Sequence, residues 1–548
     1  MSLLDLLPPE LLSHLLEYCD LPSLLSLSST CSSLHAFLAS SHFPLLARCH
    51  YNYAPTTLSH LGFHSRAPWT QRLLWADTVA ANFSSRSFKG IPLGGPSRTW
   101  RKCLPAVKLW EPLAGLGGVG GGGEVLIARG RAMETWRADH NGTMRGADVV
   151  VEGFDTHSHQ YQQQRGGRAV LEDVTALADG AKRGEVVAAR VNGVVHRLRV
   201  VKDTRRPHGP GGAVVLRETA RYDPSPPSAE GGKSGGKSTT VQALASSGGT
   251  LVCASTTRYR STSAGGSGFS TPREANPSSS TPDLSSLSLA ASLSSRAAPS
   301  AHSVSIHSLA APWEAATHIP FQAKPWSVLL SPSFSSDSSS LPTWLVVGNT
   351  GRAPLSLVPL RPSGPLAPVT LAHTAKPTSV YALTTPSPSC SPFLHPTQTL
   401  VAAFYDSTTR IYDLRLPSPS SSSSFSDPPA SRPSNEVLRL SDPWSDDPSY
   451  SVALSGPLGC SLAVGSARNA AVRLFDLRQP SHPTGLTAFA PGRHRSPVYG
   501  LAAEGSRVWG VTDQRGFGFD WEAFPGGEGE GVSYVSHEGG GGELRRTW

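Results

Sequence analysis

Three stretches in the C-terminal third of the chain repeat one order of residues. In each stretch an apolar run leads to a polar turn residue, and a second run ends in Asp beside an aromatic residue. The paired runs are 399–406 with 410–415, 461–466 with 473–478, and 508–513 with 517–521. The turn residue precedes the terminal Asp by the same interval each time: Asp406 and Asp413, Asn469 and Asp476, Asp513 and Asp520. Short apolar runs bounded by turns predict antiparallel strands, and the shared register predicts a repeated unit.

Further short runs extend this pattern in both directions. A run precedes each of the three units, at 379–383, 451–454 and 496–501. Four weaker units come earlier in the chain: 125–128 with 133–136; 174–177 with 186–189 and 194–198; 241–244 with 251–254 and a delayed 304–306; and 326–329 with 344–348 and 355–358. The chain is therefore predicted to be mainly β, with seven such units. A β-sandwich or barrel is the alternative, but neither requires a shared register.

The units resemble WD-repeat blades, whose third strand usually ends in Trp-Asp. His494, four residues before Val498, stands where that family places a His. The resemblance implies a seven-bladed WD-repeat β-propeller over residues 104–525, a ring that hides its sheet edges. Seven blades need about 300 residues, so we assign the surplus to insertions rich in Ser, Pro and Gly, which we expect to be disordered loops. These insertions are 221–238, 259–302, 331–341, 384–398 and 416–436.

The first fifty residues contain sixteen Leu. Leu11, Leu12, Leu15 and Leu16 recur at helical spacing, and breaks near Asp20 and Thr30 predict three short helices. A unit this small buries little of its own surface, so some leucines should stay exposed and mark a partner site. The alternative is a helical cap that packs on the rest of the chain.

This segment resembles an F-box over about residues 4–48. The resemblance rests on Leu-Pro-Pro-Glu-Leu-Leu at 7–12, Asp-Leu-Pro-Ser-Leu at 20–24 and Thr-Cys-Ser-Ser-Leu at 30–34. It implies docking onto the Skp adaptor of an SCF-type cullin ubiquitin ligase. The adaptor contacts that the resemblance implies are Leu7, Pro8, Leu11, Leu15, Leu21, Leu24 and Leu34.

The order of the segments predicts the domain organisation. We expect an F-box helical domain at 1–50, a linker at 51–103 with a helix in 66–83, the propeller at 104–525 and a Gly-rich tail at 526–548. An F-box followed by WD repeats resembles the F-box/WD-repeat protein family. Residues 100–105 and 495–499 are similar to its dactylin branch.

Charge and cysteine usage exclude several classes of protein. The net charge of +8 is spread along the chain without a dense Lys/Arg run, so no nucleic-acid partner is expected. The seven Cys are odd in number and lack C-x-x-C spacing, which favours a reducing compartment, cytoplasmic and/or nuclear.

The N-terminal leucines do not form a continuous apolar segment. They are interrupted by Asp5, Pro8, Pro9 and Glu10, so we expect neither a signal peptide nor a membrane span.

Two motifs suggest catalysis but lack the required context. Residues 231–238 fit the phosphate-loop pattern G-x-x-x-x-G-K-S, and 232–236 fit the nucleophile elbow G-x-S-x-G. Both motifs need a strand before the loop and a helix after it, whereas a Pro-rich segment precedes them here. His157 and His159 lack a nearby carboxylate or Cys cluster and are interpreted as a solvated loop. We therefore predict no catalytic residue, no cofactor and no metal.

The sequence thus favours a non-enzymatic substrate-recognition subunit of an SCF-type ubiquitin-protein ligase. Its partners would be the Skp adaptor, the cullin ligase core and a target protein, for which a phosphorylated degron is one option. Arg410, Arg473 and Arg515 could pair with the phosphate; the alternative, which we favour, is that they are solvated charges on outward blade faces. The alternative functions are a WD-repeat scaffold in a complex unrelated to ubiquitin and, from residues 231–238, an ATPase.

Overall fold

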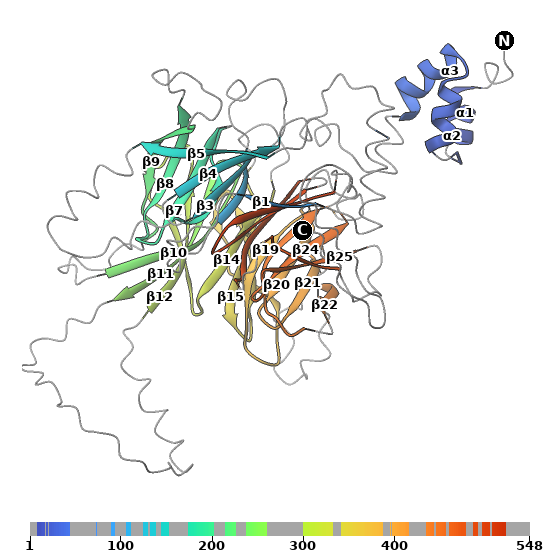
Figure 1. Cartoon of the computed structure of the whole chain (residues 1–548). Helices are drawn as coiled ribbons and strands as arrows, with labels where there is room; N and C mark the ends of the chain where they lie inside the picture. The colour runs from blue at the N-terminus through green and yellow to red at the C-terminus, as the bar shows by residue number, and fades with distance from the viewer. Residues whose placement is uncertain are drawn as a thin grey trace, which may run out of the picture.

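A computed structural model gives the architecture of the chain (Figure 1). It describes residues 8–16, 18–19, 21–43, 73, 89–93, 106–110, 124–129, 132–138, 144–152, 174–182, 184–201, 214–225, 237–259, 300–332, 341–386, 395, 397–415, 435–442, 445–455, 460–477, 486–491, 496–504 and 507–521.

The N-terminal residues form the predicted helices. They are α1 (Pro9–Leu16), α2 (Leu21–Ser28), α3 (Ser32–Phe37) and the short π-helical turn η2 (Leu38–His42) that continues α3. Pro9 opens α1, where its missing amide proton would lack a partner in any case. One apolar cluster holds the helices together: Leu12, Leu16, Leu21, Leu24, Leu34, Leu38, Phe43 and Leu73. Leu73 belongs to the predicted 66–83 helix, whose other residues lie outside the described ones.

The strands fall into antiparallel units that follow one another along the chain. Unit 1 contains β2 (Ala106–Trp110), β3 (Glu124–Arg129), β4 (Ala132–Ala138) and β5 (Met144–Glu152); unit 2 contains β6 (Val174–Asp179), β7 (Glu185–Arg190), β8 (Val195–Val201) and β9 (Val214–Tyr222); unit 3 contains β10 (Lys237–Ser247), β11 (Thr250–Tyr259), β12 (Ser300–Ser308) and β13 (Thr317–Phe321). The outer strands β5 and β9 also pair with each other, in parallel.

The later units repeat this order. Unit 4 contains β14 (Pro325–Leu330), β15 (Trp344–Gly351), β16 (Leu355–Arg361), β17 (Gly364–Pro365) and β18 (Val369–Ala372); unit 5 contains β19 (Thr378–Thr384), β20 (Thr399–Phe404), β21 (Thr408–Asp413) and β22 (Glu436–Ser441); unit 6 contains β23 (Ser449–Ser455), β24 (Ser461–Ser466), β25 (Ala471–Asp476) and β26 (Leu486–Phe489); unit 7 contains β27 (Val498–Glu504), β28 (Arg507–Thr512) and β29 (Gly516–Asp520). The strand pairs predicted in the three register-matched units, and the delayed strand at 304–306, are confirmed.

The units close into a ring. The first strand of each unit contacts the first strand of the next, in the circle β2, β6, β10, β14, β19, β23, β27 and back to β2. A strand from before unit 1, β1 (Lys89–Leu93), completes unit 7 by pairing antiparallel with β29, from Lys89 opposite Asp520 to Leu93 opposite Gly516 (Figure 1). This ring of antiparallel sheets is a β-propeller, and it excludes the sandwich alternative. The pairing of β1 with β29 closes the ring between the N-terminal and the C-terminal end of the propeller, and it covers the sheet edge of β29.

Two predicted boundaries differ from the structure. The predicted linker 51–103 contains β1, so the propeller begins before residue 104. A lone five-residue strand has no repeat signature, which is why the pattern did not reveal it. The predicted insertions lie mostly outside the described residues, but strand residues occupy their margins, namely Arg221–Tyr222, Lys237–Ser238, Tyr259, Ser300–His302, Thr384 and Glu436. The predicted tail 526–548 lies outside the described residues.

Neighbouring units are joined near the ring centre by side-chain hydroxyls. Ser327 Oγ in β14 donates to the carbonyl of Val380 in β19 at 3.0 Å, and Ser451 Oγ in β23 donates to the carbonyl of Val498 in β27 at 2.8 Å. Gly465 leaves room for the second contact, because a Cβ there would lie 2.2 Å from Ser451 Oγ and 2.7 Å from a methyl carbon of Val498. The close approach of the inner strands β23 and β27 therefore depends on glycine, which has no side chain, at position 465.

Candidate functional site

Helix α1 presents two different leucine faces. Leu12 and Leu16 are buried in the helical cluster, whereas Leu11 and Leu15 are each 54% exposed. Pro8 is also exposed, and Tyr18, beyond the end of the helix, is 80% exposed. Leu11 and Leu15 lie on one side of α1, and Pro8 and Tyr18 continue the spacing of three or four residues just beyond its two ends. We call Pro8, Leu11, Leu15 and Tyr18 the α1 stripe.

The structure divides the predicted adaptor contacts into two groups. Leu11, Leu15 and Pro8 lie on the α1 stripe, while Leu21, Leu24 and Leu34 lie inside the helical core, where Leu24 has no exposed surface. Leu7 lies outside the described residues. The helical unit buries more leucine side chains than we expected for a unit of its length, because Phe43 and Leu73 join its core. Sequence reasoning omitted Tyr18 from the contacts, although its spacing from Leu11 and Leu15 was visible.

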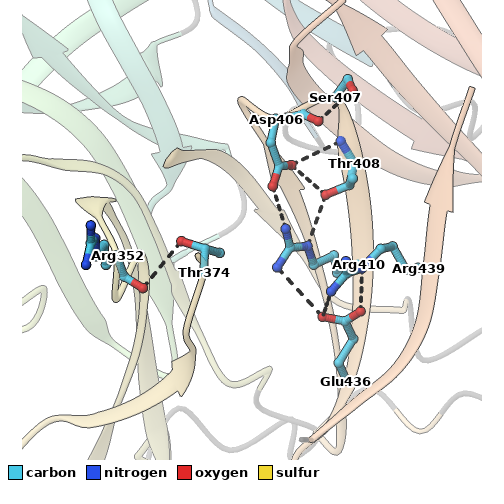
Figure 2. Close-up of polar contacts among 8 residues, drawn as sticks. All are labelled: Arg352, Thr374, Asp406, Ser407, Thr408, Arg410, Glu436 and Arg439. Carbon is cyan, nitrogen blue, oxygen red and sulfur yellow. Dashed lines mark hydrogen bonds and ion pairs between the residues drawn. The ribbon is translucent and has the colours of Figure 1, made fainter. Parts of the chain in front are cut away.

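Arg410 in β21 is enclosed by groups of its own unit (Figure 2). Its side chain is 4% exposed and forms ion pairs with Asp406 in the β20–β21 turn and with Glu436 at the start of β22, the latter at 3.7 Å. Its Nε also donates to Thr408 Oγ1 at 3.0 Å, and its guanidinium carbon lies 4.1 Å from the ring centre of Phe404. The guanidinium therefore stabilises the blade from within.

Arg473 repeats this arrangement in unit 6. It is 5% exposed, and its guanidinium contacts Asp442 at 3.2 Å and Ser445 Oγ at 2.6 Å. These partners lie in the connection from unit 5, so the ion pair links two units. Both interpretations made from the sequence are therefore wrong for Arg410 and Arg473: these arginines are neither solvated outward charges nor accessible phosphate ligands. Burial lowers the pKa of Arg515, the third predicted arginine.

The catalytic motifs do not acquire the context that they need. Lys237 and Ser238 begin strand β10, whereas a phosphate loop requires a helix at this point. His157 and His159 lie outside the described residues. Within the described part of the chain, no group of three His, Cys, Asp or Glu side chains could hold a metal ion. The same residues include no helix long and apolar enough to cross a membrane.

Comparison with known families assigns the helical segment. Residues 4–46 match the F-box domain family, and the search of curated proteins found no match. Solved structures similar to this chain include Raptor of Chaetomium thermophilum (9% identity, TM-score 0.43, covering 83% of this chain and 32% of Raptor), the Cps50 (Swd1) β-propeller domain of Myceliophteria thermophila (10%, 0.40, 77% and 98%) and the WD40 β-propeller domain of Doa1 (10%, 0.40, 79% and 97%). The chain thus spans about a third of the length of Raptor.

The family match and the strand topology together define the class of protein. An F-box domain precedes a β-propeller. In the three register-matched units of this propeller, the third strands end in an aromatic residue followed by Asp; these strands are β21, β25 and β29. The chain therefore combines an F-box domain match at residues 4–46 with a β-propeller that carries WD-like third strands.

Proposed function

We propose that this chain is the substrate-recognition subunit of an SCF-type cullin ubiquitin-protein ligase. In this proposal the F-box domain docks the Skp adaptor, and the propeller holds a target protein near the ubiquitin carrier of the ligase. The chain itself supplies proximity, and the chemistry belongs to its partners. We further propose that it acts in the cytoplasm, the nucleus or both.

The α1 stripe is the observation that carries this proposal. Leu11 and Leu15 are large apolar side chains that remain more than half exposed beside a completed helical core. Exposed leucines grouped on one helix face mark a protein contact, because burying them on binding releases about 25 cal/mol per Å² of apolar surface. Every buried residue of the helical cluster lies between Leu12 and Leu73, so among the described residues this core draws no side chain from the propeller strands. This favours an autonomous docking module over a cap packed on the ring.

Co-purification tests the proposal. The full chain should retain a Skp adaptor and a cullin, and the double variant Leu11→Asp/Leu15→Asp should lose both. Val437→Asp is the matched control, since Val437 is a 56% exposed apolar residue in β22 of the propeller. Failure of the unmodified full chain to retain the adaptor and the cullin would reject the proposal and favour a scaffold outside the ubiquitin system. Retention of the adaptor by the double variant would reject the α1 stripe as the docking surface.

A further inference from the structure

The innermost strands of units 4 to 7 share a local irregularity. In each strand the pairing with the next strand skips one residue: Trp326 in β14, Tyr381 in β19, Tyr450 in β23 and Tyr499 in β27. A bulge leaves its extra residue outside the regular pairing and re-aims the side chain. The same device therefore redirects an aromatic side chain in four successive units. Units 2 and 3 carry similar bulges but with Thr175 and Gln242 at the skipped position.

These four side chains form a continuous row across the units. The ring centres lie 5.0 Å apart for Trp326 and Tyr381, 4.6 Å for Tyr381 and Tyr450, and 6.2 Å for Tyr450 and Tyr499. All four side chains are partly exposed. Tyr405, 49% exposed in the β20–β21 turn, adds a ring 5.7 Å from that of Tyr381. We call Trp326, Tyr381, Tyr450 and Tyr499 the aromatic row.

Hydrogen bonds fix the Trp326 end of the row. Its indole Nε1 donates to Thr350 Oγ1 at 2.8 Å, and that hydroxyl also bonds Ser379 Oγ at 3.0 Å in the next unit. A fixed ring loses little conformational entropy when a partner covers it. Partly exposed Trp and Tyr held in this way are the side chains that dominate protein-binding surfaces.

Positive charge gathers at the same end. Lys324 Nζ lies 3.5 Å from the ring centre of Trp326. Burial lowers the pKa of Lys324, and the nearby charge of Arg258 lowers it further. Within the described part of the chain, no carboxylate forms an ion pair with Lys324. A cation that is half-buried beside another cation favours the approach of an anion.

The burial of Arg410 and Arg473 removes these two predicted phosphate ligands from consideration. Phosphate recognition typically uses clustered arginines that donate in a bidentate manner. Arg410 and Arg473 are already enclosed by Asp406, Glu436 and Asp442. The cation that contacts the row directly is therefore the single ammonium of Lys324 on Trp326, and one ammonium matches the charge of one carboxylate.

We propose that the aromatic row binds an extended, unphosphorylated peptide segment of the target protein, with an Asp or Glu side chain at Lys324 and apolar side chains along the tyrosines. This inference rests on the proposed function, because it names the class of target that the propeller would hold. Adaptor docking and peptide binding use different modules, so each can fail without the other.

A peptide-display selection provides the test. The full chain is the bait for a library of random twelve-residue peptides, and the affinity of a selected synthetic peptide is measured by fluorescence polarisation. We expect selected peptides to combine an acidic residue with large apolar residues. Tyr450→Ala should weaken binding about tenfold or more, as expected for a central aromatic contact. Trp313→Ala is the matched control, because Trp313 is 81% exposed and lies outside the row; it should leave the affinity unchanged.

Charge exchange tests the polarity of the site. Lys324→Glu should weaken the binding of the acidic peptide. Replacing the acidic residue of the peptide with Lys should restore binding to that variant. Thermal melting of each variant verifies that the propeller is folded. The inference is overturned if the selected peptides lack acidic residues, if Tyr450→Ala binds like wild type, or if binding requires a phosphorylated residue. Leu11→Asp/Leu15→Asp should bind the peptide normally, which separates this result from the test of adaptor docking.

Discussion

Replacing Arg410 with Ala tests whether the blade arginines stabilise the fold or contact a ligand. Removing one partner of a buried ion pair costs about 3–5 kcal/mol when the other charge stays buried. Here Asp406 is 35% exposed, and Glu436 keeps an ion pair with Arg439 at 2.7 Å, so solvent and Arg439 partly compensate both carboxylates. We therefore expect a loss of about 2 kcal/mol in the free energy of unfolding, which lies within the range for a hydrogen bond to a charged group.

Guanidinium denaturation followed by tryptophan fluorescence measures this loss as a lower unfolding midpoint. Arg415→Ala is the matched control in the same unit, because Arg415 also pairs with an aspartate, Asp413, but is 66% exposed. The control should leave the midpoint unchanged, since exposed ion pairs contribute little. If Arg410→Ala unfolds at the wild-type midpoint but weakens the binding of a phosphorylated peptide, our structural assignment of this arginine is incorrect.

Three further predictions follow from the packing and from buried histidines. Leu24→Ala should destabilise the helical domain by about 2–5 kcal/mol, measured as faster hydrogen exchange in α1 to α3; unchanged exchange would show that Leu24 is not a core residue. Gly465→Val should lower the melting temperature of the propeller, because its side chain would occupy the space of Ser451 Oγ; a wild-type melting temperature would contradict this close approach. Burial lowers the pKa of His196 and of His307 from 6.5 to about 4, so the unfolded chain binds protons at a higher pH than the native chain does. Stability should therefore fall as the pH drops from 6.5 toward 4, and His307→Gln should reduce that fall in a pH series of unfolding midpoints; an identical pH dependence would reject this role.

The pH prediction depends on which influence on His196 is strongest. Its Nδ1 lies 2.9 Å from Glu218 Oε2, a contact that by itself would raise the pKa. Burial is the larger influence, and the positive charge of Arg190 acts in the same direction. The imidazole therefore stays neutral in the folded chain at neutral pH, and the lower pKa sets the sign of the prediction.

Much of the ring was predictable from local pattern, because each strand pair needs only alternating apolar runs and a turn. Asp406 illustrates this: its carboxylate accepts from the backbone amide of Thr408 at 3.2 Å, which makes an Asp in the turn locally favourable. Strand β1 was not predictable, because only closure of the ring gives it a partner. The exposure of Leu15 and the burial of Leu16 also follow from helix packing, which a run of leucines does not specify.

Arg410 and the aromatic row show the same limit at the candidate sites. An arginine near a blade end has the same sequence signature whether it is buried or free, and its three-dimensional partners decide between the two. The aromatic residues at 326, 381, 450 and 499 lie at matching positions of successive units. Their contact depends on bulges that local pattern did not indicate.

Hydrogen exchange of the full chain, with and without a purified Skp adaptor, tests the central claim most directly. If the α1 stripe is the docking surface, adding the adaptor should slow exchange of the amides in Pro9–Leu16 and leave the propeller strands unchanged. Equal exchange of α1 in the presence and absence of a saturating adaptor concentration would contradict the account.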